Sequence, residues 1–228
     1  MSQYAAAPDP SLHPAGKTES PVVQLSLRII RLTRISDAGL NLLVCAIAIF
    51  LLGPMVVEVF LEIDLDEAAW TIVFVGFLVL FCAGVVAGIA AWSMARSRFN
   101  GAEWRVAVEE ARANEETGGA LRSGTTMAAA GGTAAVASHV VSGTAPEGSR
   151  TENLGDAATL AGSATAVFGI KRWNRAARGV ALAVVAAEGV DASSYWRNAG
   201  RAAWLVPAAA YLLALVLAIG VSPWATRA

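Results

Sequence analysis

The stretch that decides the fold of this chain is AAWTIVFVGFLVLFCAGVVAGIAAWSMA, residues 68–95. It contains no Asp, Glu, Lys, Arg or His, and tryptophans stand near both ends, at Trp70 and Trp92. In a helix the two indoles would lie about 33 Å apart, close to the ~30 Å thickness of a bilayer's hydrocarbon core. Because indole rings favour the membrane interface, this stretch predicts a transmembrane helix marked at both ends.

The composition also indicates a membrane protein. Of the 228 residues, 56% are hydrophobic and 15% are charged, whereas soluble domains average about 25% charged residues. The net charge of −1 gives no general attraction to nucleic acid, so we expect no nucleic-acid partner. Cys45 and Cys82 both lie within apolar runs, which argues against a disulfide framework.

Two further uncharged runs are long enough to cross a bilayer. One covers residues 38–57 and contains Gly53-Pro54, where we expect a kink. The other covers residues 202–226, within the C-terminal segment 202–228, and has Trp204 and Trp224 near its ends. Residues 1–19 are rich in proline and predict a disordered tail. The fold class expected is therefore all-α: a polytopic integral membrane protein with three transmembrane helices, two of them forming a hairpin over 38–95.

The loop charges predict how the chain is threaded. The link at 58–67 carries five carboxylates and no Lys or Arg. Arginines instead flank the other ends of the apolar runs: Arg28, Arg31, Arg34, Arg96, Arg98, Arg105, Arg197 and Arg201. Since Lys and Arg concentrate on the cytoplasmic side, the N-terminus is expected in the cytoplasm, the 58–67 loop outside, and the C-terminus on the side opposite the N-terminus.

The segment 96–201 is rich in alanine and glycine and allows two arrangements. We expect a cytoplasmic helical segment that is partly membrane-associated, because Ala, Gly, Ser and Thr contribute little to insertion. The alternative has five spans, with 126–145 and 157–170 forming a Gly/Ala hairpin in the membrane. Two added spans leave the orientation of the flanking segments unchanged, so charge does not separate the arrangements.

Two basic segments predict contact with anionic lipid headgroups. We expect residues 20–37 to form an amphipathic helix with Ser20 as N-cap. The alternative is that its arginines only set the orientation of the chain in the membrane. A second basic group surrounds Trp173. The lipid-surface residues expected are Arg28, Arg31 and Arg34 in the first segment and Lys171, Arg172, Arg175 and Arg178 in the second.

The 68–95 stretch also carries a stripe of small residues at Gly76, Gly84 and Gly88, which includes a G-x-x-x-G pattern. Such stripes let helices approach closely in lipid. The partner expected is another helix of the same chain, and self-association or a different membrane protein is the alternative. Glu58 lies within a turn of the first apolar run and is a candidate ion or proton site.

Catalytic motifs are missing from the sequence. His139 lies near Ser138 and Ser142 without a defined orienting acid, and no metal-binding or phosphate-loop motif is present. We therefore expect no catalytic, metal or cofactor site. The leading hypothesis is a non-enzymatic membrane subunit or scaffold that acts through helix–helix and lipid-surface contacts. The alternatives are a component of a transporter or pore formed by subunit association, and a small integral-membrane enzyme of a biosynthetic pathway.

Overall fold

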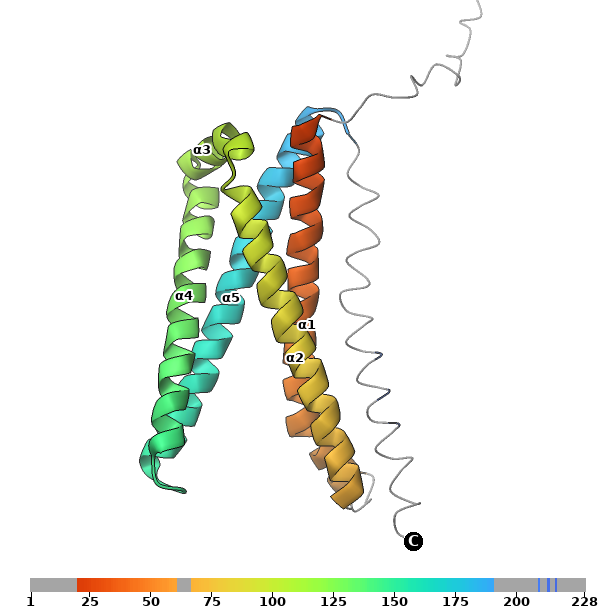
Figure 1. The fold of residues 1–228 in the computed structure, drawn as a ribbon, viewed down its shortest axis with the longest axis vertical. Helices are drawn as coiled ribbons and strands as arrows, with labels where there is room; N and C mark the ends of the chain where they lie inside the picture. The colour runs from red at the N-terminus through yellow and green to blue at the C-terminus, as the bar shows by residue number, and fades with distance from the viewer. Residues whose placement is uncertain (1–19, 61–66, 191–208, 210–212, 214–215, 217–228) are drawn as a thin grey trace, which may run out of the picture.

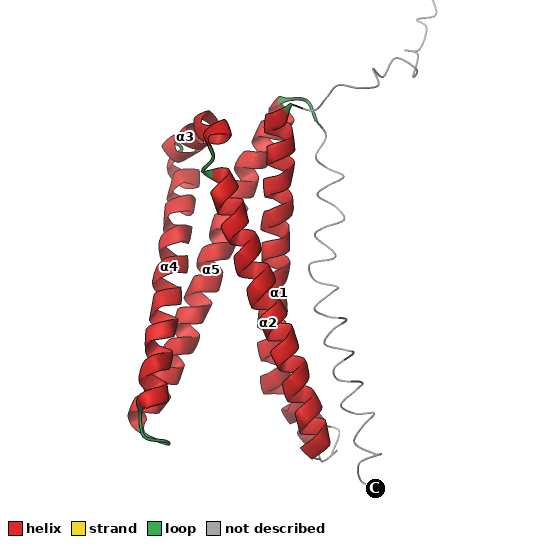
Figure 2. Cartoon of the chain, viewed as in Figure 1, coloured by secondary structure: helices red, strands yellow, loops and turns green. Residues whose placement is uncertain are grey.

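The computed structural model of the chain describes residues 20–60 and 67–190, together with the single residues 209, 213 and 216. Every regular element within these residues is helical (Figure 2), so the predicted all-α class is confirmed. The predicted tail at 1–19 lies outside the described residues. So do most of the acidic link and, apart from three residues, the predicted C-terminal span.

The helices form two antiparallel hairpins (Figure 1). The first consists of α1 (Pro21–Phe60) and α2 (Glu67–Phe99), and the second of α4 (Glu115–Thr144) and α5 (Arg150–Ala187). A short 3-10 helix, η2 (Ala102–Trp104), and α3 (Arg105–Ala113) connect them. The tips of both hairpins point the same way in Figure 1, and α3 lies at the opposite end. There α5 packs against the N-terminal half of α1.

Helix α1 unites two segments that the sequence suggested separately, the basic helix at 20–37 and the apolar run at 38–57. Its first turn is capped as predicted, because the Ser20 hydroxyl accepts a hydrogen bond from the Val23 amide at 3.3 Å. The helix continues through Pro54 to Phe60 without interruption. The basic side chains and the apolar run therefore belong to one continuous helix.

Glycines bring α1 and α2 together. A Cβ atom added to Gly84 would lie 2.8 Å from the backbone nitrogen of Leu43, too close for a real side chain. Gly88 faces Leu40, and Gly39 faces the backbone of α2 in return. Gly76, the remaining member of the predicted stripe, has nothing within 4 Å of its added Cβ. The close approach of these helices thus involves Gly84 and Gly88, with a third glycine supplied by α1.

The helices of the second hairpin also pack closely at glycines, and there the glycines are regularly spaced. Its glycines recur every seven residues, about two helical turns, so they stay on one face of each helix. They are Gly124 and Gly131 on α4, and Gly155, Gly162 and Gly169 on α5. A Cβ added to Gly131 would lie 2.5 Å from the Ala166 nitrogen. Backbone therefore packs on backbone where a soluble hairpin would interlock large side chains.

Local sequence signals define the ends of these helices. Asn114 caps α4 by accepting from the Thr117 amide at 3.1 Å. Ser149 caps α5 by accepting from the Glu152 amide at 3.2 Å. Gly148 adopts a φ of +72° in the turn between them, a left-handed conformation that favours glycine. The turn at 145–149 is therefore built by a glycine and a cap.

One helix of the described chain, Trp70–Phe99, is long and apolar enough to cross a membrane, and only 17% of its most apolar window is buried. This helix contains most of the uncharged 68–95 stretch. By this measure a single helix supports membrane association, and the predicted number of three spans is not confirmed.

Two adjacent glycines test the packing of the second hairpin. We expect Gly131→Ala to lower the free energy of unfolding by about 1–3 kcal/mol, because the new methyl group collides with the backbone of α5. The matched control is Gly132→Ala, whose Cβ would meet nothing within 4 Å. It should raise stability by about 0.5–1 kcal/mol through helix propensity. Unfolding followed by circular dichroism in detergent measures both, and equal stabilities would contradict backbone packing at Gly131.

Candidate functional site at the junction of the hairpins

The two hairpins meet in a core at the end opposite their tips, which we call the junction (Figure 1). Its buried side chains come from every described helix: Val23, Ile29, Ile30, Ala95, Phe99, Trp104, Val108, Leu121, Trp173, Ala177, Ala181 and Val185. A chain of aromatic rings runs through it. Trp173 lies edge-on to Trp92 at 6.4 Å and to Phe99 at 5.5 Å between ring centroids. Trp92, which the sequence marks as an interfacial residue, is thus partly buried against α5.

A group of polar residues, which we call the polar layer, joins α1 to α5 within the junction. It consists of Ser36, Asp37 and Asn41 on α1 and Lys171, Asn174 and Arg178 on α5. Arg178 forms an ion pair with Asp37 at 2.9 Å, and the two side chains are only 13% and 20% exposed. Lys171 donates to the Asn41 side-chain oxygen at 2.7 Å.

Asn174 is the centre of this layer and is fully buried. Its amide nitrogen donates to Ser36 Oγ at 3.0 Å and to Asp37 Oδ1 at 2.9 Å. Ser36 in turn donates to the Gly88 carbonyl on α2 at 2.8 Å. Because buried polar groups are costly unless they are hydrogen-bonded, these bonds select which faces of α1, α2 and α5 meet.

The electrostatic balance of the polar layer is positive. Burial lowers the pKa of the Arg34 guanidinium, Arg178 lowers it further, and Asp37 opposes both effects. An arginine remains charged in a protein even so. Arg178 and the neighbouring Arg34 therefore supply two cations that interact with the Asp37 carboxylate, and Lys171 adds a third at Asn41.

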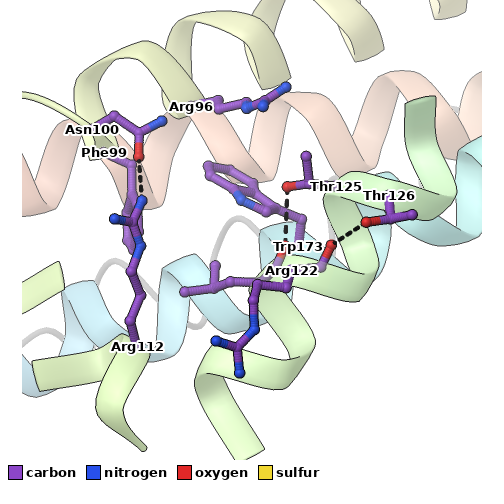
Figure 3. Close-up of a pocket in the computed structure, with 9 residues that line it drawn as sticks. Arg96, Phe99, Asn100, Arg112, Arg122, Thr125, Thr126 and Trp173 are labelled. Atoms are coloured by element: carbon purple, nitrogen blue, oxygen red, sulfur yellow. Dashed lines mark hydrogen bonds between the residues drawn. The ribbon is translucent and has the colours of Figure 1, made fainter. Parts of the chain in front are cut away.

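A separate cavity of about 380 Å³ lies on the α2–α3–α4 side of the junction, and we call it the arginine pocket. It is lined by Arg96, Phe99, Asn100, Arg112, Leu121, Arg122, Thr125, Thr126 and Trp173. Figure 3 shows Arg96, Arg112 and Arg122 on three sides of the Trp173 ring. Arg112 donates to the Asn100 side-chain oxygen at 3.1 Å. Within the described part of the chain, no carboxylate lines the pocket or pairs with any of its three arginines.

The residues selected from the sequence are distributed between surface and junction. Arg28 and Arg31 on α1 and Arg172 and Arg175 on α5 are exposed, and so could reach a lipid surface. Arg34, Lys171 and Arg178 are partly buried at the α1–α5 contact. Glu58 belongs to α1, but its side chain lies outside the described part of the structure.

Sequence reasoning missed Asp37 and Asn174 as members of a site. A signal was present: Asp37 and Asn41 are four residues apart, as are Asn174 and Arg178, so each pair shares one helical face. Which two faces meet depends on residues that are 130 and 137 positions apart in the sequence. In the described chain no three His, Cys, Asp or Glu side chains cluster as metal ligands would.

No protein-family model, curated protein or solved structure matches this chain.

A double-mutant cycle tests the polar layer. We expect Asp37→Ala and Arg178→Ala each to destabilise the fold, and the double variant to lose about 1–3 kcal/mol less than the sum, because the pair is largely buried. The matched control is the Arg105–Glu109 pair, whose side chains are 81% and 68% exposed. Its coupling should stay below about 0.5 kcal/mol. Similar coupling in both cycles would contradict a structural role for the polar layer.

Proposed function

We propose that the chain is a multi-pass membrane protein acting as a non-enzymatic subunit or scaffold, with both helical hairpins crossing the bilayer. The observation that carries the proposal is the distribution of side-chain size. The closest contacts inside each hairpin are made at glycines, whereas the exposed large apolar side chains of α2, α4 and α5 lie outside those contacts.

The second hairpin is the more informative one, because its composition alone does not predict a membrane span. The evidence for its placement comes from the side chains that it exposes. Val136, Val140, Leu154, Leu160 and Phe168 are each 59–69% exposed on α4 and α5. Each Å² of apolar surface left in water loses roughly 25 cal/mol of the stabilisation that its burial would give. In lipid the same surface carries no such penalty, and small residues favour helix contact. The arrangement therefore suits a bilayer, or a surface covered by other helices.

Charge along the hairpins supports the same placement. The tip of the second hairpin holds Glu147, Arg150, Glu152 and Asp156, so it is acidic overall, as is the 58–67 link between α1 and α2. The cations gather toward the junction: Arg28, Arg31, Arg34, Arg96, Arg98, Arg105, Arg112, Arg122, Lys171, Arg172, Arg175 and Arg178. Under the positive-inside rule the junction would lie in the cytoplasm and both tips outside.

This placement favours the arrangement with five spans, because the two tips point the same way (Figure 1). The uncharged part of α5, residues 157–170, covers about 21 Å, less than a typical hydrocarbon core. Local thinning of the bilayer, with the charged ends of this segment reaching the interfaces, would accommodate the difference. The N-terminus would be cytoplasmic and the C-terminus on the opposite side.

The scaffold role follows from which surfaces are left for contact. The polar groups between α1 and α5 bond to one another, whereas large apolar side chains are exposed on the outer faces of α2, α4 and α5. Those faces are available to lipid and to helices of another chain or a second copy.

Purification tests this role. In a mild detergent we expect the protein to migrate as an oligomer or together with other membrane-protein chains, and mass spectrometry would identify them. A Val136→Ser variant, altered on an exposed face of α4, should associate less than a Val106→Ser control, altered on the exposed side of α3. A strictly monomeric protein without co-purifying chains, which still complements its deletion in cells, would contradict the proposal.

A further inference from the structure

We propose that the arginine pocket binds a phosphate group, and that an anionic lipid headgroup supplies it. The binding of phosphate rests on the pocket alone. Only the lipid source rests on the proposed placement in a membrane.

The charge of the pocket is the first argument. Its three guanidinium groups come from three elements: Arg96 from the last turn of α2, Arg112 from α3 and Arg122 from the first turns of α4. No described carboxylate balances them in the lining. Guanidinium groups present paired donors that match phosphate oxygens, so arginines from several directions are typical of phosphate recognition.

The remaining lining adds the Asn100 amide nitrogen as a donor, and an apolar floor. The Asn100 side-chain oxygen is engaged by Arg112, which directs this amide into the same corner of the pocket (Figure 3). Thr125 and Thr126 donate their hydroxyl protons at 3.0 Å to the Leu121 and Arg122 carbonyls, so they form a polar wall of the pocket and leave phosphate binding to the arginines. Phe99 and Trp173 form the apolar part. A volume near 380 Å³ is at the small end of the range for ligand sites, about 300–1,000 Å³, and fits a headgroup.

The position of the pocket favours a lipid as the source. Arg96 lies within Trp70–Phe99, the helix apolar enough to cross a membrane, close to its C-terminal end. Arg96 also lies over the Trp92 ring, 5.5 Å from its centroid, and indoles favour the headgroup region. With α2 in a bilayer, the pocket would open at the depth of the cytoplasmic lipid phosphates.

Binding there would also connect the two hairpins. The ligand would touch α2 of the first hairpin and α4 and α5 of the second, so it would stabilise the junction in proportion to its occupancy. Stability in the presence of a ligand is therefore a direct measure of binding.

The experiment uses the purified full chain in a neutral detergent. Thermal unfolding is followed while dihexanoyl phosphatidic acid, dihexanoyl phosphatidylcholine or inorganic phosphate is titrated. The pocket variant is Arg112→Gln/Arg122→Gln. The matched control is Arg98→Gln/Arg175→Gln, which removes the same charge from exposed positions at the same end, outside the pocket.

We expect phosphatidic acid to raise the unfolding temperature of the wild type, and phosphatidylcholine to have a much smaller effect. The apparent Kd for phosphatidic acid should rise roughly 10- to 100-fold in the pocket variant, since two charge-assisted contacts are lost. In the control variant it should rise less than about threefold.

The other outcomes are also decisive. Equal weakening in both double variants would indicate a diffuse charge effect and overturn the pocket. No stabilisation by phosphatidic acid or by phosphate would overturn it as well. Stabilisation by inorganic phosphate as strong as by phosphatidic acid, lost only in the pocket variant, would keep the phosphate site and reject the lipid source. A pocket that binds as predicted in a protein that lacks membrane placement would leave the phosphate site standing, while the lipid source and the proposed function fail.

Discussion

Backbone-to-backbone contact at glycine is the constraint on which the rest of this structure depends. At Gly131 and Gly162, and again at Gly39 and Gly84, no side chain larger than hydrogen fits between the helices. Helices packed this closely bury little apolar side-chain area, so the large apolar side chains must face outward. The same constraint that shapes each hairpin therefore creates the apolar exterior, and that exterior needs lipid or other helices around it.

Glycine contacts hold each hairpin together but do not specify how the two hairpins meet. That selection comes from the junction, where the Asp37–Arg178 ion pair and the buried Asn174 fix α5 on α1. The aromatic rings around Trp173 add the apolar part of the contact. The arginine pocket lies beside them, where residues from both hairpins are brought together. The contacts that position the two hairpins and the proposed ligand pocket thus lie at the same end of the molecule.

Local patterns in the sequence predicted the helices better than their contacts. The uncharged stretch at 68–95 overlaps the one candidate membrane helix of the described residues, Trp70–Phe99. The Gly/Ala segment 157–170 falls within α5, and 126–145 ends one residue beyond α4. The seven-residue spacing of Gly155, Gly162 and Gly169 was visible in the sequence and indicates the face on which α5 packs. The number of spans was harder to predict, because alanine and glycine carry little transfer free energy in either direction. Contacts such as Lys171 with Asn41 join positions 130 residues apart, and no local pattern predicts them.

The proposal that both hairpins cross the membrane is tested most directly by finding the side on which the tip of the second hairpin lies. In a Cys45→Ala/Cys82→Ala background, a single cysteine at Glu147→Cys is compared with one at Ser97→Cys, which is exposed at the end of α2. A membrane-impermeant maleimide applied to intact cells should label the cysteine at position 147, and should reach position 97 only after the membrane is permeabilised. Labelling of both positions only after permeabilisation would place the second hairpin in the cytoplasm and contradict the account.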